Sequence, residues 1–83
     1  MNDTTALTAF THEMAKKLEA NSHKHGWDYT MDQWLLDRLN EEVEELTKAL
    51  NSEPPVPDDI VREAADVANF AMFIAAKRLK YMR

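Results

Sequence analysis

Two clusters of acidic residues, separated by a proline-rich segment, are the part of this sequence best suited to chemistry. The first cluster, in LNEEVEEL, supplies Glu41, Glu42 and Glu45, and the second, in VREAADVANF, supplies Glu63 and Asp66. Residues three or four apart share one face of a helix, so each cluster can present two carboxylates together. Carboxylates gathered in one place repel one another unless a cation neutralises them, and Mg²⁺ prefers oxygen ligands. The pattern predicts a magnesium site, with Mn²⁺ as a substitute.

The segment between the clusters, SEPPVPDD, predicts a turn because its prolines interrupt a helical pattern. If this turn folds the flanking helices into an antiparallel hairpin, the carboxylates of Glu42, Glu45, Glu63 and Asp66 converge. Four carboxylates can hold one or two ions, and the sequence does not determine which number is bound.

Asp66 and Asn69 are the only polar residues in the run AADVANFAMFIAA at 64–76. A helix that is apolar all round is buried all round, so both residues are expected to be buried. A buried carboxylate without a partner costs several kcal/mol. Arg38 is one candidate partner, and a cation shared with the acids of the preceding helix is the preferred one.

Length and composition predict a single all-α domain spanning residues 1–83. The chain is 45% hydrophobic with one glycine, and its apolar residues do not alternate as they do in strands. The net charge of −5 disfavours nucleic acid as a partner. Zero cysteines exclude disulfides and fit a cytoplasmic location. The N-terminal residues do not form a secretory signal, and the most apolar segment is too short to span a membrane.

Apolar residues at helical spacing predict three helices, at about 4–20, 29–51 and 57–80. Asp3, Thr4 or Thr5 is the expected cap of the first helix. Lys16 and Lys17 near its end favour the helix dipole, and the alternative is that one of them contacts a substrate phosphate. The apolar stripe of this helix consists of Leu7, Phe10, Met14 and Leu18.

The second helix is expected to begin with a capping box formed by Thr30 and Gln33. Glu44 is predicted to face solvent beside Lys48, opposite the other acids of its cluster. The third helix is expected to begin at Pro57, which a first turn tolerates. An apolar seam along the second helix consists of Leu36, Leu39, Val43, Leu46 and Leu50.

The polar connector NSHKHGWDYT separates the first two helices. Trp27 is expected either to anchor this loop to the core or, with Lys24, to contact the base and phosphates of a nucleotide. His23 and His25 are expected to be solvated, because a spacing of two in a loop is weak metal-site geometry. Lys77, near the end of the third helix, is expected to act as a dipole partner.

The third helix also predicts self-association. A seam of small residues lies on one side, and Phe70 and Phe73 lie on the other side, beside Glu63 and Asp66. Two helices of one short chain cannot easily cover both sides, so a homodimer or homotetramer closing a four-helix-type bundle is expected. The seam consists of Ile60, Ala64, Ala68, Ala71 and Ala75.

The spacing EExxE followed by ExxD resembles the signature of the MazG-like, all-α nucleoside triphosphate pyrophosphohydrolase superfamily. Here the motifs are EEVEE at 41–45 and EAAD at 63–66, and the runs NSHKHGW and DVANFAM also look like small, single-domain members. The resemblance implies Mg²⁺-dependent hydrolysis of a nucleoside or deoxynucleoside triphosphate to the monophosphate and pyrophosphate.

Residue roles also follow from the resemblance. It implies that Glu42, Glu45, Glu63 and Asp66 are the metal ligands. Glu41 and Glu42 are the implied catalytic residues, with Glu41 assisting from outside the ligand set or orienting the attacking water. Substrate contacts are assigned to Asn69, Lys24 and Trp27.

Two alternatives stay open. One is a phosphoribosyl-ATP pyrophosphohydrolase-like enzyme, which shares the helical fold and the acidic pattern but should carry more basic residues in its loop. The other is a non-catalytic helical oligomerisation or interaction module.

Overall fold

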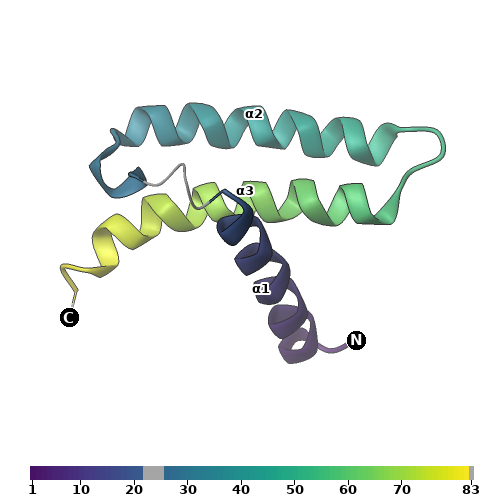
Figure 1. Cartoon of the computed structure of the whole chain (residues 1–83), viewed down its shortest axis with the longest axis horizontal. Helices are drawn as coiled ribbons and strands as arrows, with labels where there is room; N and C mark the ends of the chain where they lie inside the picture. Colours follow the sequence, from purple (N-terminus) through teal and green to yellow (C-terminus); the bar gives the residue numbers. More distant parts are fainter. Residues whose placement is uncertain (22–25, 83) are drawn as a thin grey trace.

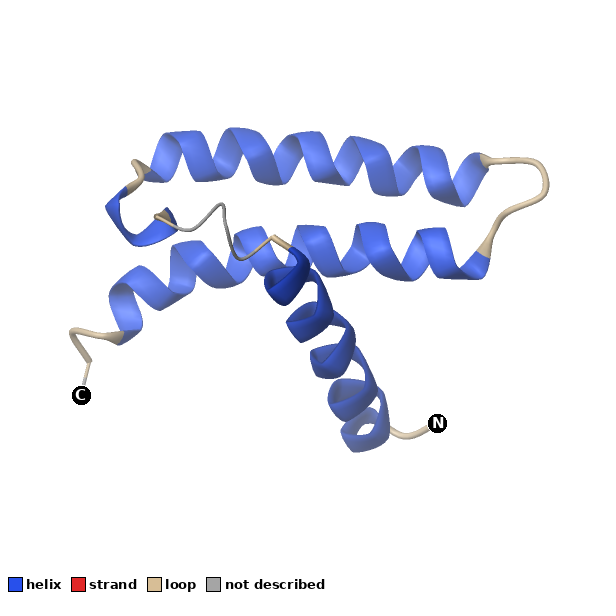
Figure 2. Cartoon of the chain, viewed as in Figure 1, coloured by secondary structure: helices blue, strands red, loops and turns tan. Residues whose placement is uncertain are grey.

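The computed structural model describes residues 1–21 and 26–82, and over these ranges the chain is helical without strands (Figure 1, Figure 2). Helix α1 spans Asp3–Ala20, the short 3₁₀ helix η2 spans Trp27–Tyr29, α2 spans Asp32–Asn51 and α3 spans Pro57–Leu79. The predicted all-α class and three main helices are therefore confirmed. The predicted bounds are within three residues of the observed ones at every helix end.

Helices α2 and α3 lie side by side as an antiparallel hairpin, and α1 extends away from it (Figure 1). The C-terminal part of α1 contacts the middle of α3, whereas its N-terminal end points away from the hairpin. This arrangement brings the two acidic clusters onto neighbouring helices, as the turn prediction required.

The start of α1 is capped by Asn2, not by Asp3, Thr4 or Thr5 as predicted. The side-chain oxygen of Asn2 accepts a hydrogen bond from the backbone N–H of Thr5 at 2.8 Å, which satisfies one of the free donors of the first turn. Asp3 lies in that first turn, where its charge complements the helix dipole.

The predicted capping box at the start of α2 is wrong. The helix begins at Asp32, and Met31 occupies the cap position without a side-chain hydrogen bond. The hydroxyl of Thr30 instead donates to the backbone carbonyl of Gly26 at 2.9 Å, closing the turn around η2. Gly26 has a φ of 125°, which side chains rarely allow, so glycine is required at this position.

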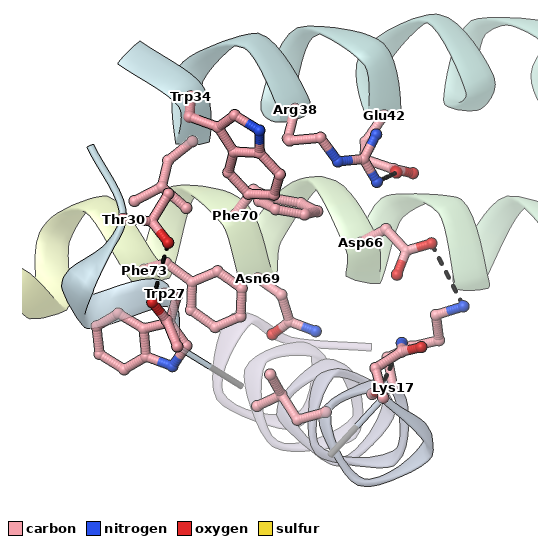
Figure 3. Close-up of a pocket in the computed structure, with 14 residues that line it drawn as sticks. Lys17, Trp27, Thr30, Trp34, Arg38, Glu42, Asp66, Asn69, Phe70 and Phe73 are labelled. Atoms are coloured by element: carbon pink, nitrogen blue, oxygen red, sulfur yellow. Dashed lines mark hydrogen bonds and ion pairs between the residues drawn. The ribbon is translucent and has the colours of Figure 1, made fainter. Parts of the chain in front are cut away.

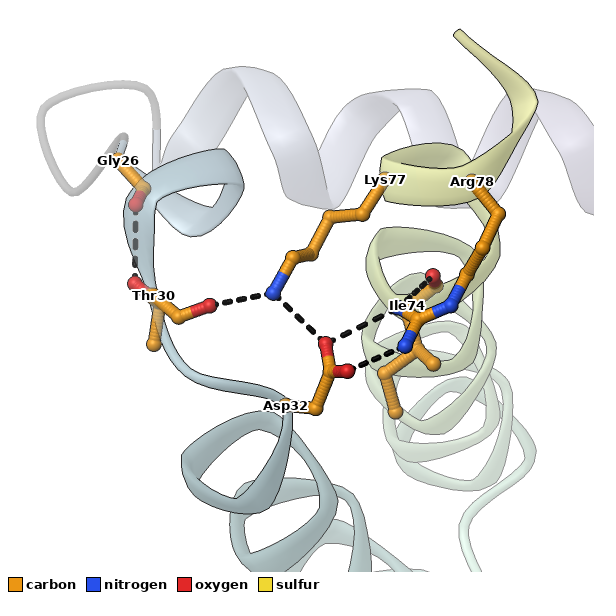
Figure 4. A network of polar contacts seen from close by, with 6 residues as sticks. All are labelled: Gly26, Thr30, Asp32, Ile74, Lys77 and Arg78. Atoms are coloured by element: carbon orange, nitrogen blue, oxygen red, sulfur yellow. Dashed lines mark hydrogen bonds and ion pairs between the residues drawn. The ribbon is translucent and has the colours of Figure 1, made fainter. Parts of the chain in front are cut away.

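A polar network ties the start of α2 to the end of α3 (Figure 4). The Lys77 ammonium lies 2.7 Å from the carboxylate of Asp32 and donates to the backbone carbonyl of Thr30 at 2.6 Å. Arg78 also pairs with Asp32. Lys77 thus holds two elements together, rather than acting only on its own helix dipole.

The hydrophobic core of the single chain is small. Among the described residues, the buried apolar side chains are Leu35 and Ala65, and Asn69 is the buried polar one. The predicted seam of α2 is only partly correct, because Leu36, Val43 and Leu50 are 42%, 42% and 56% exposed. Asp66 is half-buried rather than buried, since α3 leaves one side open.

The isolated chain exposes more surface than a compact protein of its size. Its accessible area is 6313 Å² for 9.6 kDa, whereas the usual scaling predicts about 5,100 Å². Its radius of gyration is 13.8 Å, against roughly 12 Å expected for 83 residues. None of the helices in the described ranges combines the length and apolar content needed to cross a bilayer.

Candidate metal and ligand site

Three carboxylates from the two acidic clusters meet between α2 and α3. One oxygen each from Glu42, Glu63 and Asp66 lies within 4.8 Å of the others, and all three residues are half-buried. Glu42 comes from α2, and Glu63 and Asp66 lie one turn apart on α3. The hairpin therefore brings together three of the four acids that the sequence predicted as metal ligands.

The electrostatics of this acidic triad show that its members share one field. Burial raises the pKa of Glu42, and the neighbouring Asp66 carboxylate raises this pKa further, while Arg38 lowers it. Burial and then Asp66 likewise raise the pKa of Glu63. Burial and the neighbouring carboxylates therefore both disfavour the charged forms of Glu42 and Glu63, and a bound cation would offset this cost.

The fourth predicted ligand, Glu45, lies outside the triad. Its carboxylate is 3.3 Å from the ammonium of Lys48, and its side chain is half-exposed. It remains close enough to raise the pKa values of both Glu42 and Glu63. Lys48 thus pairs with Glu45, not with Glu44 as its sequence position suggested, and Glu44 is exposed as predicted.

Glu41 also points away from the triad. Its side chain is exposed and pairs with Arg38, which additionally contacts Glu42 at 3.1 Å. This position matches a supporting role through Arg38 and does not match the orientation of a water molecule at the triad. Arg38 is therefore not the partner of Asp66 that the sequence left open.

The partner of Asp66 is Lys17 of α1, whose ammonium lies 3.3 Å from the carboxylate (Figure 3). The two side chains are 27% and 20% exposed, so the pair is largely shielded from water. The sequence offered two roles for Lys17, as a partner of the helix dipole or as a contact for a substrate phosphate. Neither role describes its position fully, because its ammonium is already paired with Asp66, an acid of the triad.

A cavity of about 450 Å³ opens beside the triad. Figure 3 shows charged side chains at one end and aromatic side chains at the other, with Asn69 between them. Residues from all three main helices and from the connector line it. They are Lys17, Leu18, Asn21, Gly26, Trp27, Thr30, Trp34, Leu35, Arg38, Glu42, Asp66, Asn69, Phe70 and Phe73.

The aromatic end of the cavity is built on α3. Trp27 stacks on Phe73 with ring centroids 5.1 Å apart and an interplanar angle of 10°, and Phe70 meets Phe73 edge-on at 5.6 Å. The guanidinium of Arg38 lies 5.2 Å from the centre of the Phe70 ring. Trp34 borders the cavity and is 53% exposed, which leaves part of its ring open to a ligand.

Trp27 has the anchoring role that the sequence offered, because its stack on Phe73 ties the connector to α3. It also lines the cavity, and its contact with a nucleotide stays a prediction. Lys24, the other predicted substrate contact of the connector, lies outside the described residues, as do His23 and His25. Phe73 and Trp34 also line the cavity, although the sequence motifs gave neither residue a role in ligand binding. Their helical spacing from Asp66 and Glu42 could have predicted that they share a face with these acids.

Asn69 lines this cavity and is itself buried. It is 4% exposed, and its amide nitrogen donates to the backbone carbonyl of Met14 at 3.1 Å. Its amide oxygen is buried and has no hydrogen-bond partner among the described residues. One of the two N–H groups of this amide is committed to Met14, and the oxygen is left as an acceptor. Such an orphaned acceptor is costly and is typically explained by a ligand or water.

The triad suits a hard divalent cation. Carboxylate oxygens are the ligands that Mg²⁺ and Mn²⁺ prefer. Oxygens that share one octahedral Mg²⁺ lie about 3 to 4 Å apart, so the 4.8 Å span requires small side-chain rotations or a bridging water. Glu42, Glu63 and Asp66 are the residues that would hold the ion.

Comparisons with protein-family models, with curated proteins and with solved structures gave no match to this chain. The resemblance to MazG-like enzymes therefore rests on the motif residues themselves.

Proposed function

We propose that this chain is a Mg²⁺-dependent nucleotide pyrophosphohydrolase of the MazG-like type, converting nucleoside or deoxynucleoside triphosphates into monophosphates and pyrophosphate. The observation that carries the proposal is one cavity lined at one end by Glu42 and Asp66 of the acidic triad and at the other by stacked aromatic rings. A triphosphate with its metal suits the first end, and a flat base suits the second.

The spacing along α3 supports this orientation of the substrate. Asp66 and Phe73 lie seven residues apart, which is two helical turns and about 10 Å along the axis. This separation is comparable to that between the phosphates and the base of an extended nucleotide. Asn69 lies between them, at the level where the sugar would be, so its unpaired oxygen suits a sugar hydroxyl or a base N–H.

In the proposed reaction, water attacks the α-phosphorus, the bond from this phosphorus to the bridging oxygen breaks, and pyrophosphate leaves. Bound Mg²⁺ supplies charge neutralisation and water activation in reactions of this class. Glu42, Glu63 and Asp66 would hold the ion, and Arg38 pairs with both Glu42 and Glu41. The aromatic end excludes water from the base and fixes the reach of the substrate.

A homo-oligomer is part of the proposal. The excess accessible area and the exposed Leu36, Val43 and Leu50 support it, because these three residues recur every seven positions on one face of α2. A second copy covering this face would bury side chains that one chain cannot bury. Light scattering coupled to gel filtration tests this point: Val43→Glu should shift the protein towards monomer, whereas Glu44→Lys should not. A wild-type monomer at micromolar concentration contradicts it.

One assay tests the function: pyrophosphate release from ribo- and deoxyribonucleoside triphosphates and from phosphoribosyl-ATP, with and without Mg²⁺. Release from ordinary triphosphates that requires Mg²⁺ supports the proposal. Preference for phosphoribosyl-ATP favours the related enzyme of that specificity. Absence of any release, with a folded protein and bound Mg²⁺, favours a non-catalytic helical module. The same proposal places the protein in the cytoplasm, where triphosphates are present.

A further inference from the structure

Lys17 is held against the acidic triad by a helix that is otherwise loosely attached. It lies near the end of α1, one turn after Met14, whose carbonyl receives the hydrogen bond from Asn69. This anchor fixes the backbone near Lys17, and the ammonium then reaches Asp66 at 3.3 Å.

The ammonium of Lys17 lies beside Asp66, where a metal ion bound by the triad would also lie. An ammonium and a divalent ion would both use the oxygens of Asp66, and they repel each other, so full occupancy by both is unfavourable. Mg²⁺ carries the higher charge and can contact all three carboxylates, whereas the ammonium contacts Asp66 alone among them at ion-pair distance. Lys17 also lines the cavity itself, so its flexible side chain can leave Asp66 without leaving the cavity.

We propose that Lys17 is the resident counter-ion of Asp66 in the metal-free protein, that Mg²⁺ displaces its ammonium, and that the freed ammonium then contacts the phosphates of the bound nucleotide. The inference rests on the proposed metal site. In this inference Lys17 exchanges one anionic partner, the Asp66 carboxylate, for another, the phosphates of the nucleotide. The charge of the site is therefore balanced both before and after Mg²⁺ binds. Lys17 is thus the counter-ion of Asp66 in the metal-free site and a binding residue for phosphate.

The first test is calorimetric titration with Mg²⁺ alone. Removing the competing charge in Lys17→Met should tighten Mg²⁺ binding by about 3- to 10-fold, the effect of losing an ion pair of modest strength. Lys17→Arg keeps the charge and should bind Mg²⁺ like the wild type. Lys16→Met is the matched control, because Lys16 pairs with Glu13 at 3.0 Å and its side chain is 59% exposed, so the affinity should change less than about 2-fold.

The second test adds inorganic pyrophosphate at saturating Mg²⁺. Lys17→Met should weaken pyrophosphate binding by about 10-fold, because a charge-assisted contact to phosphate is lost, whereas Lys16→Met should not. A merely structural Lys17 would weaken Mg²⁺ and pyrophosphate binding together. Opposite changes in the two affinities are therefore the signature of the exchange.

A third measurement needs no variant that might unfold. In the wild-type protein, side-chain amine signals followed by NMR during a Mg²⁺ titration should shift for Lys17 and stay in place for Lys16. Unchanged Lys17 signals, or equal Mg²⁺ affinity in wild type and Lys17→Met, would overturn the inference while leaving the metal site intact. A wild-type protein that binds no Mg²⁺ overturns the metal site itself, so the two failures can be told apart.

Discussion

The side-chain amide of Asn69 on α3 donates a hydrogen bond to the backbone carbonyl of Met14 on α1, with 3.1 Å between nitrogen and oxygen. This bond joins the first helix to the hairpin. It also fixes the orientation of the amide, so that its oxygen is buried and lacks a partner among the described residues, while the residue itself lines the cavity. One side chain thus sets both the placement of α1 and the polarity of the cavity wall.

Asn69→Asp should destabilise the fold. The substitution keeps the shape of the side chain but replaces the donor that faces Met14 with an oxygen, and it adds a charge near Asp66. We expect a loss of about 1–3 kcal/mol in the free energy of unfolding, measured by urea denaturation. Asn40→Asp, which adds the same charge at an exposed position of α2, should change this free energy little.

Asp66→Asn should abolish most Mg²⁺-dependent turnover while preserving helicity. The change removes a proposed ligand charge with little change in volume, and turnover should fall by about 100-fold or more, since even changes to groups that support metal ligands cost about 10–100-fold. Glu45→Gln is the informative comparison, because Glu45 lies outside the triad and pairs with Lys48. Its effect should stay below about 10-fold. Equal losses in both variants would contradict the three-residue site.

The metal-free protein should lose stability as pH rises above 4.5, the usual pKa of a glutamate. The pKa values of Glu42 and Glu63 are raised in the folded state by burial and by Asp66, so the folded state binds protons more readily than the unfolded state above this pH. Their ionisation above the usual value of 4.5 therefore destabilises the fold.

Glu42→Gln should flatten this decline and raise the melting temperature of the metal-free protein at pH 7. It should also reduce the rise in melting temperature that Mg²⁺ gives the wild type. Thermal scans at several pH values, with Mg²⁺ and with chelator, measure both effects. A decline that is equally steep in Glu42→Gln would mean that other groups cause it.

Asp32→Asn should weaken the junction between the start of α2 and the end of α3. Hydrogen bonds from Arg78 and then Lys77 hold the pKa of Asp32 well below its usual value of 3.8, so its contribution to stability is present above that value. The contribution is lost as pH falls through the lowered pKa. Denaturation should show wild type more stable than Asp32→Asn at pH 6, with the difference shrinking in strong acid. Asp37→Asn, at an exposed position of the same helix, is the control.

Trp27→Ala should weaken nucleotide binding more than it slows the chemical step. Base–aromatic stacking is worth about 1–3 kcal/mol, and the proposed contact lies two helical turns from the metal ligands. Steady-state kinetics should therefore show a raised KM with kcat changed less. Tyr29→Ala is the control, since Tyr29 is 91% exposed. If KM is unchanged and the apparent kcat falls only in proportion to the unfolded fraction of the protein, Trp27 serves as a loop anchor alone.

The helices, their approximate bounds and the convergence of three acids were predictable from local pattern. Apolar spacing predicts where the backbone is helical, and the prolines predict where it turns. A short turn between two helices leaves few arrangements other than a hairpin. The caps were less predictable, because Asn2, Thr5 and Thr30 can each bond to several nearby backbone groups with similar energy.

The residue types and spacings of the sequence determined an all-helical chain with acidic residues on facing helices. The pairs Arg38–Glu42 and Lys48–Glu45 lie within α2 at i,i+4 and i,i+3 spacing, so local periodicity brings them together. Only the tertiary structure decided which cation Asp66 meets, placing Lys17 of α1 beside it. The physical reason is that helical periodicity orients side chains within one helix, whereas the approach of α1 to α3 depends on contacts between residues more than fifty positions apart, such as Asn69 and Met14.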